Sequence, residues 1–143
     1  MSDLAQAIAE LSGEFALLPD WEERIAYIIE LARTLDPLAD DERTEANRVR
    51  GCVSRVWLVS ERRAEAPDKL FFRGDSDAHL VRGEIAVLLR IFSGRSPREI
   101  LSVDPKAVFA QLGLHEALTA QRSNGLFSMM ARIQDEARHA LSD

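Results

Sequence analysis

The chain has 143 residues, a length that suits one domain with a substantial core, so we predict a single domain over residues 1–143. Apolar residues make up 46% and charged residues 29%, which excludes the low hydrophobicity of a disordered chain. A formal net charge of -6 argues against a general nucleic-acid binder, because affinity for phosphate backbones rests on clustered Lys and Arg. A protein or small-molecule partner is therefore expected.

Two amphipathic helices are predicted ahead of Pro37. The first carries an apolar stripe at helical spacing, made by Leu4, Ile8, Leu11 and Phe15. Asp20 suits the N-cap of the second, because its side chain can accept from a backbone N–H that the helix leaves unpaired. Pro37 stops this helix, and the acidic stretch of residues 36–45 shows no period. We predict a solvated loop there.

An antiparallel hairpin is predicted in the middle of the chain. Residues 54–60 alternate between apolar and polar side chains, and residues 69–73 form a short segment rich in Phe. Their connection, residues 61–68, is polar and is predicted to be a surface loop. Residues 47–50 are predicted to add a third short strand, which turns into the next at Gly51.

Helices are predicted for the rest of the chain. A buried central helix covers residues 81–92 and closes at Gly94, and Ser96 and Asp104, each followed by proline, begin two short helices. The last helix carries a stripe of Leu126, Met130, Ile133 and Ala137. This order predicts an α+β fold with a small antiparallel sheet of about three strands packed on helices.

The cellular compartment follows from cysteine usage and from the N-terminal residues. One cysteine cannot form an internal disulfide, and the start of the chain lacks the basic and apolar regions of a secretory signal. We therefore expect a reducing cytoplasm. The longest apolar run, residues 85–89, is far shorter than the roughly 18 residues that a membrane-spanning helix needs, so no membrane partner is expected.

Cys52 is the residue best suited to carry chemistry. We predict an exposed turn there, and Gly51 can take positive φ, which would present the sulfur. The thiolate is the reactive form, and Arg48, Arg50 and Arg55 supply, in sequence, the positive charge that lowers a thiol pKa. The alternative is a small buried hydrophobe, because free cysteine is among the most buried residue types.

The segment around Cys52 resembles a known family signature. Residues 47–57 read Asn-Arg-Val-Arg-Gly-Cys-Val-Ser-Arg-Val-Trp, which is similar to the cysteine-loop pattern Asn-Arg-Val-x-Gly-Cys-x-Ser-x-Val-Trp of the SufE family of sulfur acceptors. Further matches are Gly-Asp-Ser-Asp-Ala at 74–78, Val-Arg-Gly at 81–83 and Arg-Ser-Asn-Gly-Leu at 122–126. The resemblance spans most of the chain from residue 47 onward and implies a SufE/IscU-like fold.

The resemblance implies a specific role for Cys52. Proteins of this family take sulfur from the active-site persulfide of a cysteine desulfurase, stimulate that enzyme and pass the sulfur to a scaffold for iron–sulfur clusters. The pyridoxal phosphate belongs to the desulfurase, so no bound cofactor is expected in this chain. We expect the sulfur to turn inward in the free protein, since persulfides are easily reduced, and to swing out in the complex.

The residues that could support this cysteine are Arg50, Gly51, Ser54, Arg55, Asp75, Asp77 and Arg122. Asp75 and Asp77 are either caps of the following helix or carboxylates near the loop, where they would orient an arginine or meet the desulfurase. Arg122 is either a solvated or capping residue, or it lies beside Cys52.

Three other classes of function fit the sequence less well than sulfur transfer. In a cysteine hydrolase, Cys52 would be the nucleophile, with a distant histidine such as His79 or His115 as its base. A cluster scaffold needs several cysteines, and this chain has one. A DNA-binding helical module needs a basic recognition helix, which the balanced charge after Arg95 does not provide.

Overall fold

The computed structural model describes residues 2–52, 54–113 and 120–142, with side chains in the last range described from residue 125 onward. They form α1 (Asp3–Ala16), α2 (Trp21–Leu31), β1 (Val56–Arg63), β2 (Ala66–Ser76), α3 (His79–Phe92), α4 (Pro97–Leu101), α5 (Pro105–Leu112) and α6 (Ala120–Ser142). Two short 3-10 helices, η1 (Ala32–Thr34) and η2 (Asp40–Glu42), lie between α2 and β1. The predicted α+β class is confirmed.

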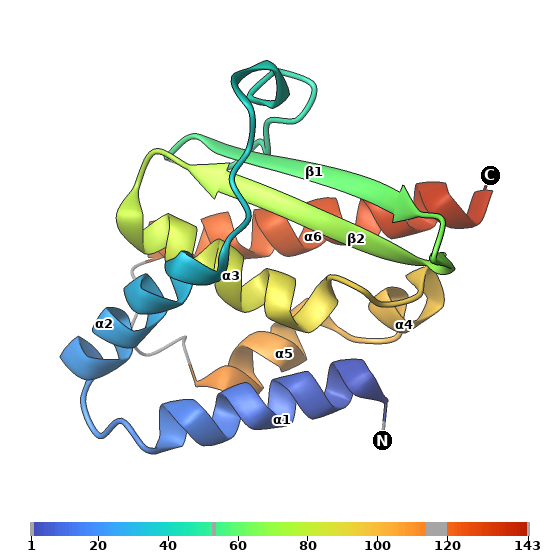
Figure 1. The fold of residues 1–143 in the computed structure, drawn as a ribbon. Coiled ribbons are helices and arrows are strands. Elements are labelled where there is room, and N and C mark those ends of the chain that lie inside the picture. Colours follow the sequence, from blue (N-terminus) through green and yellow to red (C-terminus); the bar gives the residue numbers. More distant parts are fainter. Residues whose placement is uncertain (1, 53, 114–119, 143) are drawn as a thin grey trace.

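The elements are stacked in layers (Figure 1). The hairpin of β1 and β2 forms one face, α3 and α6 pack beneath it, and α1 and α5 lie on the far side. The core between these layers is apolar and includes Val56, Leu58, Phe72, Ile85, Leu88, Phe92, Leu126, Met130 and Ile133. No helix in the described part of the chain is long and apolar enough to cross a membrane.

Both N-terminal helices begin at a side-chain cap, of which the one at Asp20 was predicted. Ser2 accepts from the backbone N–H of Ala5, and Asp20 accepts from the N–H of Glu23 at 2.8 Å. The stripe predicted for α1 is buried. In α2 only Ile28 is buried, because this helix packs at the edge of the molecule against α3, with its backbone close to Gly83.

The hairpin is longer than predicted. The strands pair antiparallel from Val56 opposite Ser76 to Arg63 opposite Ala66, so most of the predicted connection is strand. The side chains of this connection are polar although it is strand, because a two-stranded sheet covered by helices on one face leaves the other face to water. The predicted third strand is wrong: among the described residues, Arg48 forms an isolated bridge to Trp57 outside the named strands.

The segment between α2 and β1 is not the freely solvated loop that we predicted. It crosses the outer face of the hairpin (Figure 1), where Leu38 is buried. The carboxylate of Glu42 accepts from Nη1 of Arg73 on β2 at 2.9 Å. The acidic side chains of this segment therefore serve in part to fasten it to the sheet.

The helices after the hairpin also follow their predicted signals. Ser96 accepts from the N–H of Glu99, and Asp104 accepts from the N–H of Lys106, so α4 and α5 start where expected. The Glu99 carboxylate in turn accepts from the N–H of Leu4 at 3.2 Å, which joins α4 to the beginning of α1.

Candidate functional site

The loop that carries Cys52 lies at the end of the molecule where β1 and α6 begin (Figure 1). Gly51 has φ of 88°, the left-handed conformation that glycine adopts without steric cost. A Cβ atom added to Gly51 would lie 2.5 Å from Oγ of Ser128 on α6. The loop is therefore seated directly on α6, and glycine is required both for the turn and for the close approach.

The sulfur of Cys52 faces the protein interior. Its Sγ donates to the backbone carbonyl of Gly125 on α6 at 3.6 Å, and the half-buried side chain packs against the core. The turn is exposed at Gly51, as predicted, whereas Cys52 itself is half-buried and its sulfur is turned inward, as expected for the free protein. The turn lies at the surface, but the thiol points away from solvent.

The environment of Cys52 favours the protonated thiol. Burial raises the pKa of Cys52, the nearby carboxylate of Glu84 raises it further, and Arg48 opposes both. The predicted lowering of this pKa by three arginines is wrong, because burial has the largest effect and Arg48 is the arginine whose charge opposes it. The other two arginines pair with carboxylates. Nη2 of Arg50 lies 2.8 Å from Oε2 of Glu45, and Nε of Arg55 lies 3.2 Å from Oδ2 of Asp77.

Two connections fasten the loop on either side of the cysteine. On α6, Arg132 donates to the backbone carbonyls of Ala46 and Arg48 at 2.9 and 3.1 Å. At the start of β1, Asp77 accepts from both the backbone N–H and Nε of Arg55. The cysteine loop is therefore held at both ends, and the described contacts of its tip are with α6.

Asp75 and Asp77 orient arginines and do not cap α3. The residue before α3 is Ala78, which makes no side-chain cap bond. Oδ2 of Asp75 lies 2.7 Å from Nη2 of Arg43, and Oδ1 of Asp75 lies 2.9 Å from Nε of Arg82. Although burial opposes the change, the hydrogen bonds from Arg43 and from a backbone N–H, with the charge of Arg82, lower the pKa of Asp75.

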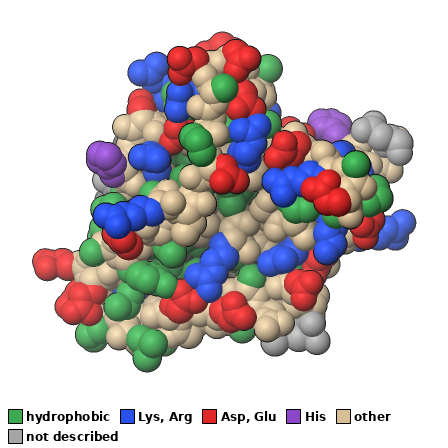
Figure 2. All heavy atoms as spheres, viewed as in Figure 1, with side chains coloured by type: hydrophobic (Ala, Val, Ile, Leu, Met, Phe, Trp, Pro, Cys, Tyr) green, Lys and Arg blue, Asp and Glu red, His purple; other side chains and the backbone are tan. Residues whose placement is uncertain are grey.

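Acidic and basic side chains are interspersed over the face seen in Figure 2. On this face, the positive charges are not gathered into one continuous patch.

The remaining predicted residues lie around the same loop or outside the described part. Ser54 is half-buried between Cys52 and β1. The backbone of Arg122 belongs to the first turn of α6, but its side chain lies outside the described residues. The expectation that Arg122 lies beside Cys52 therefore stays a prediction.

The histidines proposed as hydrolase bases are not brought to the cysteine in the described part of the chain. His79 begins α3 and lines a pocket with Glu30 and Arg82, on the side that faces α2. His115 lies outside the described residues. The hydrogen bond described for Cys52 joins it to Gly125 instead.

Three residues of the site were missed by sequence reasoning. Gly125 and Ser128 form the seat of the loop, and Glu84 adds a buried carboxylate from α3. Gly125 lies inside the motif at 122–126, which was a usable signal. Glu84 was also visible as the charged residue directly before the apolar run of residues 85–89.

Fold and site together define a small α+β protein that carries one thiol in a short loop between a helix and a hairpin. The chain belongs to the SufE family: the family model described as "Fe-S metabolism associated domain" matches residues 9–137. In the described part, no group of three His, Cys, Asp or Glu side chains could hold a metal ion.

Known proteins similar to this chain agree with that assignment. An uncharacterized SufE-like protein of Rhizobium etli is 44% identical over 133 residues, covering 92% of this chain and 90% of the relative. One from Rhizobium meliloti is 44% identical over 136 residues, covering 94% and 97%. The solution structure of a hypothetical protein from Thermus thermophilus aligns with a TM-score of 0.76 at 25% identity, covering 99% of this chain and 97% of that one.

Proposed function

We propose that this protein is a sulfur acceptor that takes persulfide sulfur from a cysteine desulfurase onto Cys52. The observation that carries the proposal is the position of the single cysteine, at a Gly51 turn held at both ends and within the segment that matches the SufE signature. The 44% identity to SufE-like relatives over most of the chain supports the same role.

The chemical step is a thiol exchange at sulfur. The Cys52 thiolate attacks the terminal sulfur of the persulfide on the desulfurase, and a new S–S bond forms on Cys52. The S–S bond to the desulfurase cysteine breaks, and that cysteine leaves as a thiolate with the electron pair. The proton lost by Cys52 balances the proton that the leaving thiolate takes up, so no external oxidant or reductant is needed.

This chain needs no cofactor of its own for the step, because pyridoxal phosphate acts in the desulfurase to generate the persulfide. We propose that the sulfur then passes to a scaffold for iron–sulfur clusters, in keeping with the Fe-S metabolism domain of the family. Neither nucleic acid nor a membrane takes part in this scheme. The reducing cytoplasm is its proposed location, since free thiols persist there.

The inward sulfur requires the loop to move during transfer. Cys52 is half-buried against α6, so its sulfur must leave the Gly125 carbonyl to reach a persulfide on another protein. The two fastened ends, at Arg132 and at Asp77, keep the movement local. Docking on the desulfurase supplies the contacts that stabilise the lifted loop.

Mass spectrometry tests the proposal directly. The protein is incubated with a cysteine desulfurase and free cysteine, and a gain of one sulfur atom is expected at Cys52. The Cys52→Ser variant should fold normally but gain no sulfur and give no stimulation of sulfide release. Full stimulation by the serine variant, or sulfur found elsewhere, would refute the carrier role.

A further inference from the structure

One face of α6 carries the cysteine loop from its tip to its base. This face is made by four residues at intervals of three and four positions, which lie on the same side of a helix: Gly125, Ser128, Arg132 and Glu136. Gly125 and Ser128 contact the tip of the loop, at Cys52 and Gly51. Arg132 contacts its base, where the chain approaches the cysteine through residues 46–48. The helix therefore holds the loop at two separate points.

The base of the loop is paired with β1 on one side. The N–H of Leu58 donates to the carbonyl of Asn47 at 2.8 Å, and the N–H of Val49 donates to the carbonyl of Val56 at 2.9 Å. These two bonds flank the isolated bridge described above. The amide hydrogens of Leu58 and Val49 therefore report whether the base of the loop stays closed.

Arg132 covers the opposite side of the same segment. Successive carbonyls of an extended chain point to opposite sides, so those of Ala46 and Arg48 face away from β1. Nη2 of Arg132 donates to the carbonyl of Ala46 at 2.9 Å, and Nη1 donates to that of Arg48 at 3.1 Å. The guanidinium thus occupies the edge at which a further strand would pair.

Two further contacts orient this guanidinium. Nε of Arg132 donates to Oε1 of Glu136, one turn along α6, at 3.1 Å. Oε2 of the same carboxylate accepts from Oγ of Ser60 on β1 at 2.9 Å. Because a guanidinium is planar and its N–H directions are fixed, holding Nε also fixes the directions in which the other two nitrogens donate.

The contacts at the two ends of the loop differ in strength. At the tip, the thiol of Cys52 donates to the carbonyl of Gly125 at 3.6 Å, and an S–H group is a weak donor. At the base, the donor is the charged Arg132, and charge-assisted hydrogen bonds are roughly twice as strong as neutral ones. The tip should therefore leave α6 while the base stays in place.

We propose that Arg132 is a positioning residue of sulfur transfer: it pins the base of the cysteine loop to α6, so that Cys52 lifts about a fixed point and meets the persulfide in a defined place. The inference rests on the proposed function, because it concerns how the same cysteine is presented. Asp77 fixes the other end of the loop at Arg55, so the part that lifts is the short turn at Gly51 and Cys52.

The expected effect of losing this pin is on the transfer step. A loop with a free base brings the sulfur to the persulfide in many positions, and a misplacement of about 1 Å can cost about 100-fold in rate. Docking should be unaffected, because the guanidinium of Arg132 is turned onto the backbone of its own chain and 25% of the side chain is exposed.

Hydrogen exchange tests the pin on the full chain without a desulfurase. Arg132→Met keeps an unbranched apolar stem and removes every donor, so the amides of Leu58 and Val49 should exchange about tenfold faster. Arg138→Met is the matched control, because Arg138 is also on α6 and its Nη1 lies 2.7 Å from Oδ1 of Asp135. This control should leave both amides unchanged. Wild-type exchange of both amides in Arg132→Met would overturn the inference.

Stimulation of a cysteine desulfurase separates positioning from stability. Each variant is titrated onto a desulfurase that the wild type stimulates, with cysteine in excess. In Arg132→Met the maximal rate should fall about threefold or more, while the half-saturating concentration stays unchanged. Partial unfolding or weaker docking would instead raise the half-saturating concentration and leave the maximal rate as it was, and that result would overturn the inference.

Arg132→Lys covers the case in which Arg132→Met does not fold. It keeps the positive charge, but an ammonium group cannot reproduce the planar fork that serves Glu136 and two carbonyls together. Its maximal rate should therefore also lie below that of the wild type, and a wild-type maximum in every folded Arg132 variant would overturn the inference. Failure of the wild type itself to gain sulfur on Cys52 would instead refute the carrier role, and the exchange measurement would still decide whether Arg132 pins the loop.

Discussion

Asp77 holds Arg55 through two contacts, accepting from its backbone N–H at 3.1 Å and from its Nε at 3.2 Å. Arg55 is the last residue before β1, so this pair fixes the point at which the cysteine loop enters the sheet. Ser76 strengthens the junction by donating to the carbonyl of Arg55 at 2.6 Å. Movement of the loop should therefore stop at Arg55.

Removal of the Asp77 carboxylate should loosen the loop. In Asp77→Ala, both contacts to Arg55 are lost, and we expect faster amide exchange in the loop and faster alkylation of Cys52. The loss of stability should be about 1 kcal/mol, because these bonds lie at the surface. Hydrogen exchange measured by mass spectrometry, together with a urea melt, checks both expectations.

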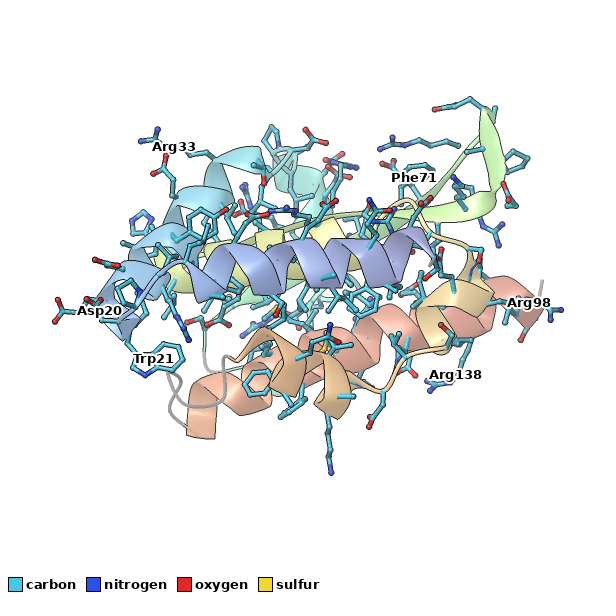
Figure 3. The ribbon with its side chains drawn as sticks, turned by 90° about the horizontal axis from the view of Figure 1, so that it is seen from below. Asp20, Trp21, Arg33, Phe71, Arg98 and Arg138 are labelled. Carbon is cyan, nitrogen blue, oxygen red and sulfur yellow. The ribbon has the colours of Figure 1, made fainter. Side chains whose placement is uncertain are left out.

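The matched control for Asp77 lies at the opposite end of the molecule. In Figure 1, β2 ends on the side of the molecule where α6 begins, and Figure 3 places Arg138 toward the other end of α6. Asp135→Ala removes an exposed ion pair with Arg138 and should change stability by less than about 0.5 kcal/mol, without any effect on the loop. Equal loop exchange in both variants would contradict the role of Asp77.

Substitution of Gly51 should unseat the loop. Gly51→Ala places a Cβ atom 2.5 Å from Oγ of Ser128 and forces a left-handed conformation that costs about 1–2 kcal/mol. We expect lower stability and a more accessible Cys52, measured by chemical denaturation and by alkylation.

A double variant separates the two effects at Gly51. Gly51→Ala with Ser128→Ala removes the closest contact but keeps the backbone strain. Part of the lost stability should therefore return, giving a coupling energy of about 0.5 kcal/mol or more between the two positions. Strict additivity of the two single variants would show that the loop does not sit on Ser128.

The size of the Cys52 side chain should matter little for stability. Because the thiol is half-buried, Cys52→Ala should cost about 1 kcal/mol or less, measured as a change in the free energy of unfolding. Leu126→Ala, on the fully buried face of α6, should cost about 2–5 kcal/mol and serves as the comparison. A similar loss of unfolding free energy in both variants would mean that Cys52 serves mainly as a core residue.

The parts of the fold that were predictable are those fixed by local signals. The N-caps at Asp20 and Ser96 and the apolar stripe of α1 depend on neighbours a few residues away, and all are present in the structure. The hairpin was predicted too short because sequence alone does not show which of its faces is covered by helices. The strand predicted at 47–50 was wrong because these residues form a single bridge, which is too short for the alternating pattern that distinguishes a strand in a sequence.

The sequence predicted which residue carries the thiol, but it did not predict the charges that surround the sulfur. Cys52 and the Gly51 turn follow from a contiguous motif. The charge around the sulfur depends on pairs formed across the fold. Arg55 donates to Asp77, which is 22 positions away in the sequence, and the charge of Glu84 on α3 raises the pKa of Cys52. Proximity in sequence therefore suggested an activated thiol, whereas the folded chain holds a suppressed one.

Glu42 should make stability depend on pH in the acid range. The hydrogen bond from Arg73, with one from the backbone of Ala39, lowers the pKa of Glu42 from 4.5 to about 2. A carboxyl group whose pKa is lower in the folded state stabilises the fold fully above its unfolded pKa, and this contribution is lost as the pH falls. The contribution of Glu42 should therefore be complete above about pH 5 and decline from there to about pH 2.

The comparison of wild type with Glu42→Gln isolates this contribution. The melting temperatures should differ most near neutral pH and converge as the pH approaches 2, because the protonated glutamate then resembles glutamine. Exposure to solvent and salt weakens the pair, so the difference should also shrink at high ionic strength. Two melting curves that run parallel over the whole acid range would mean that Glu42 does not hold the 36–45 segment on the sheet through its charge.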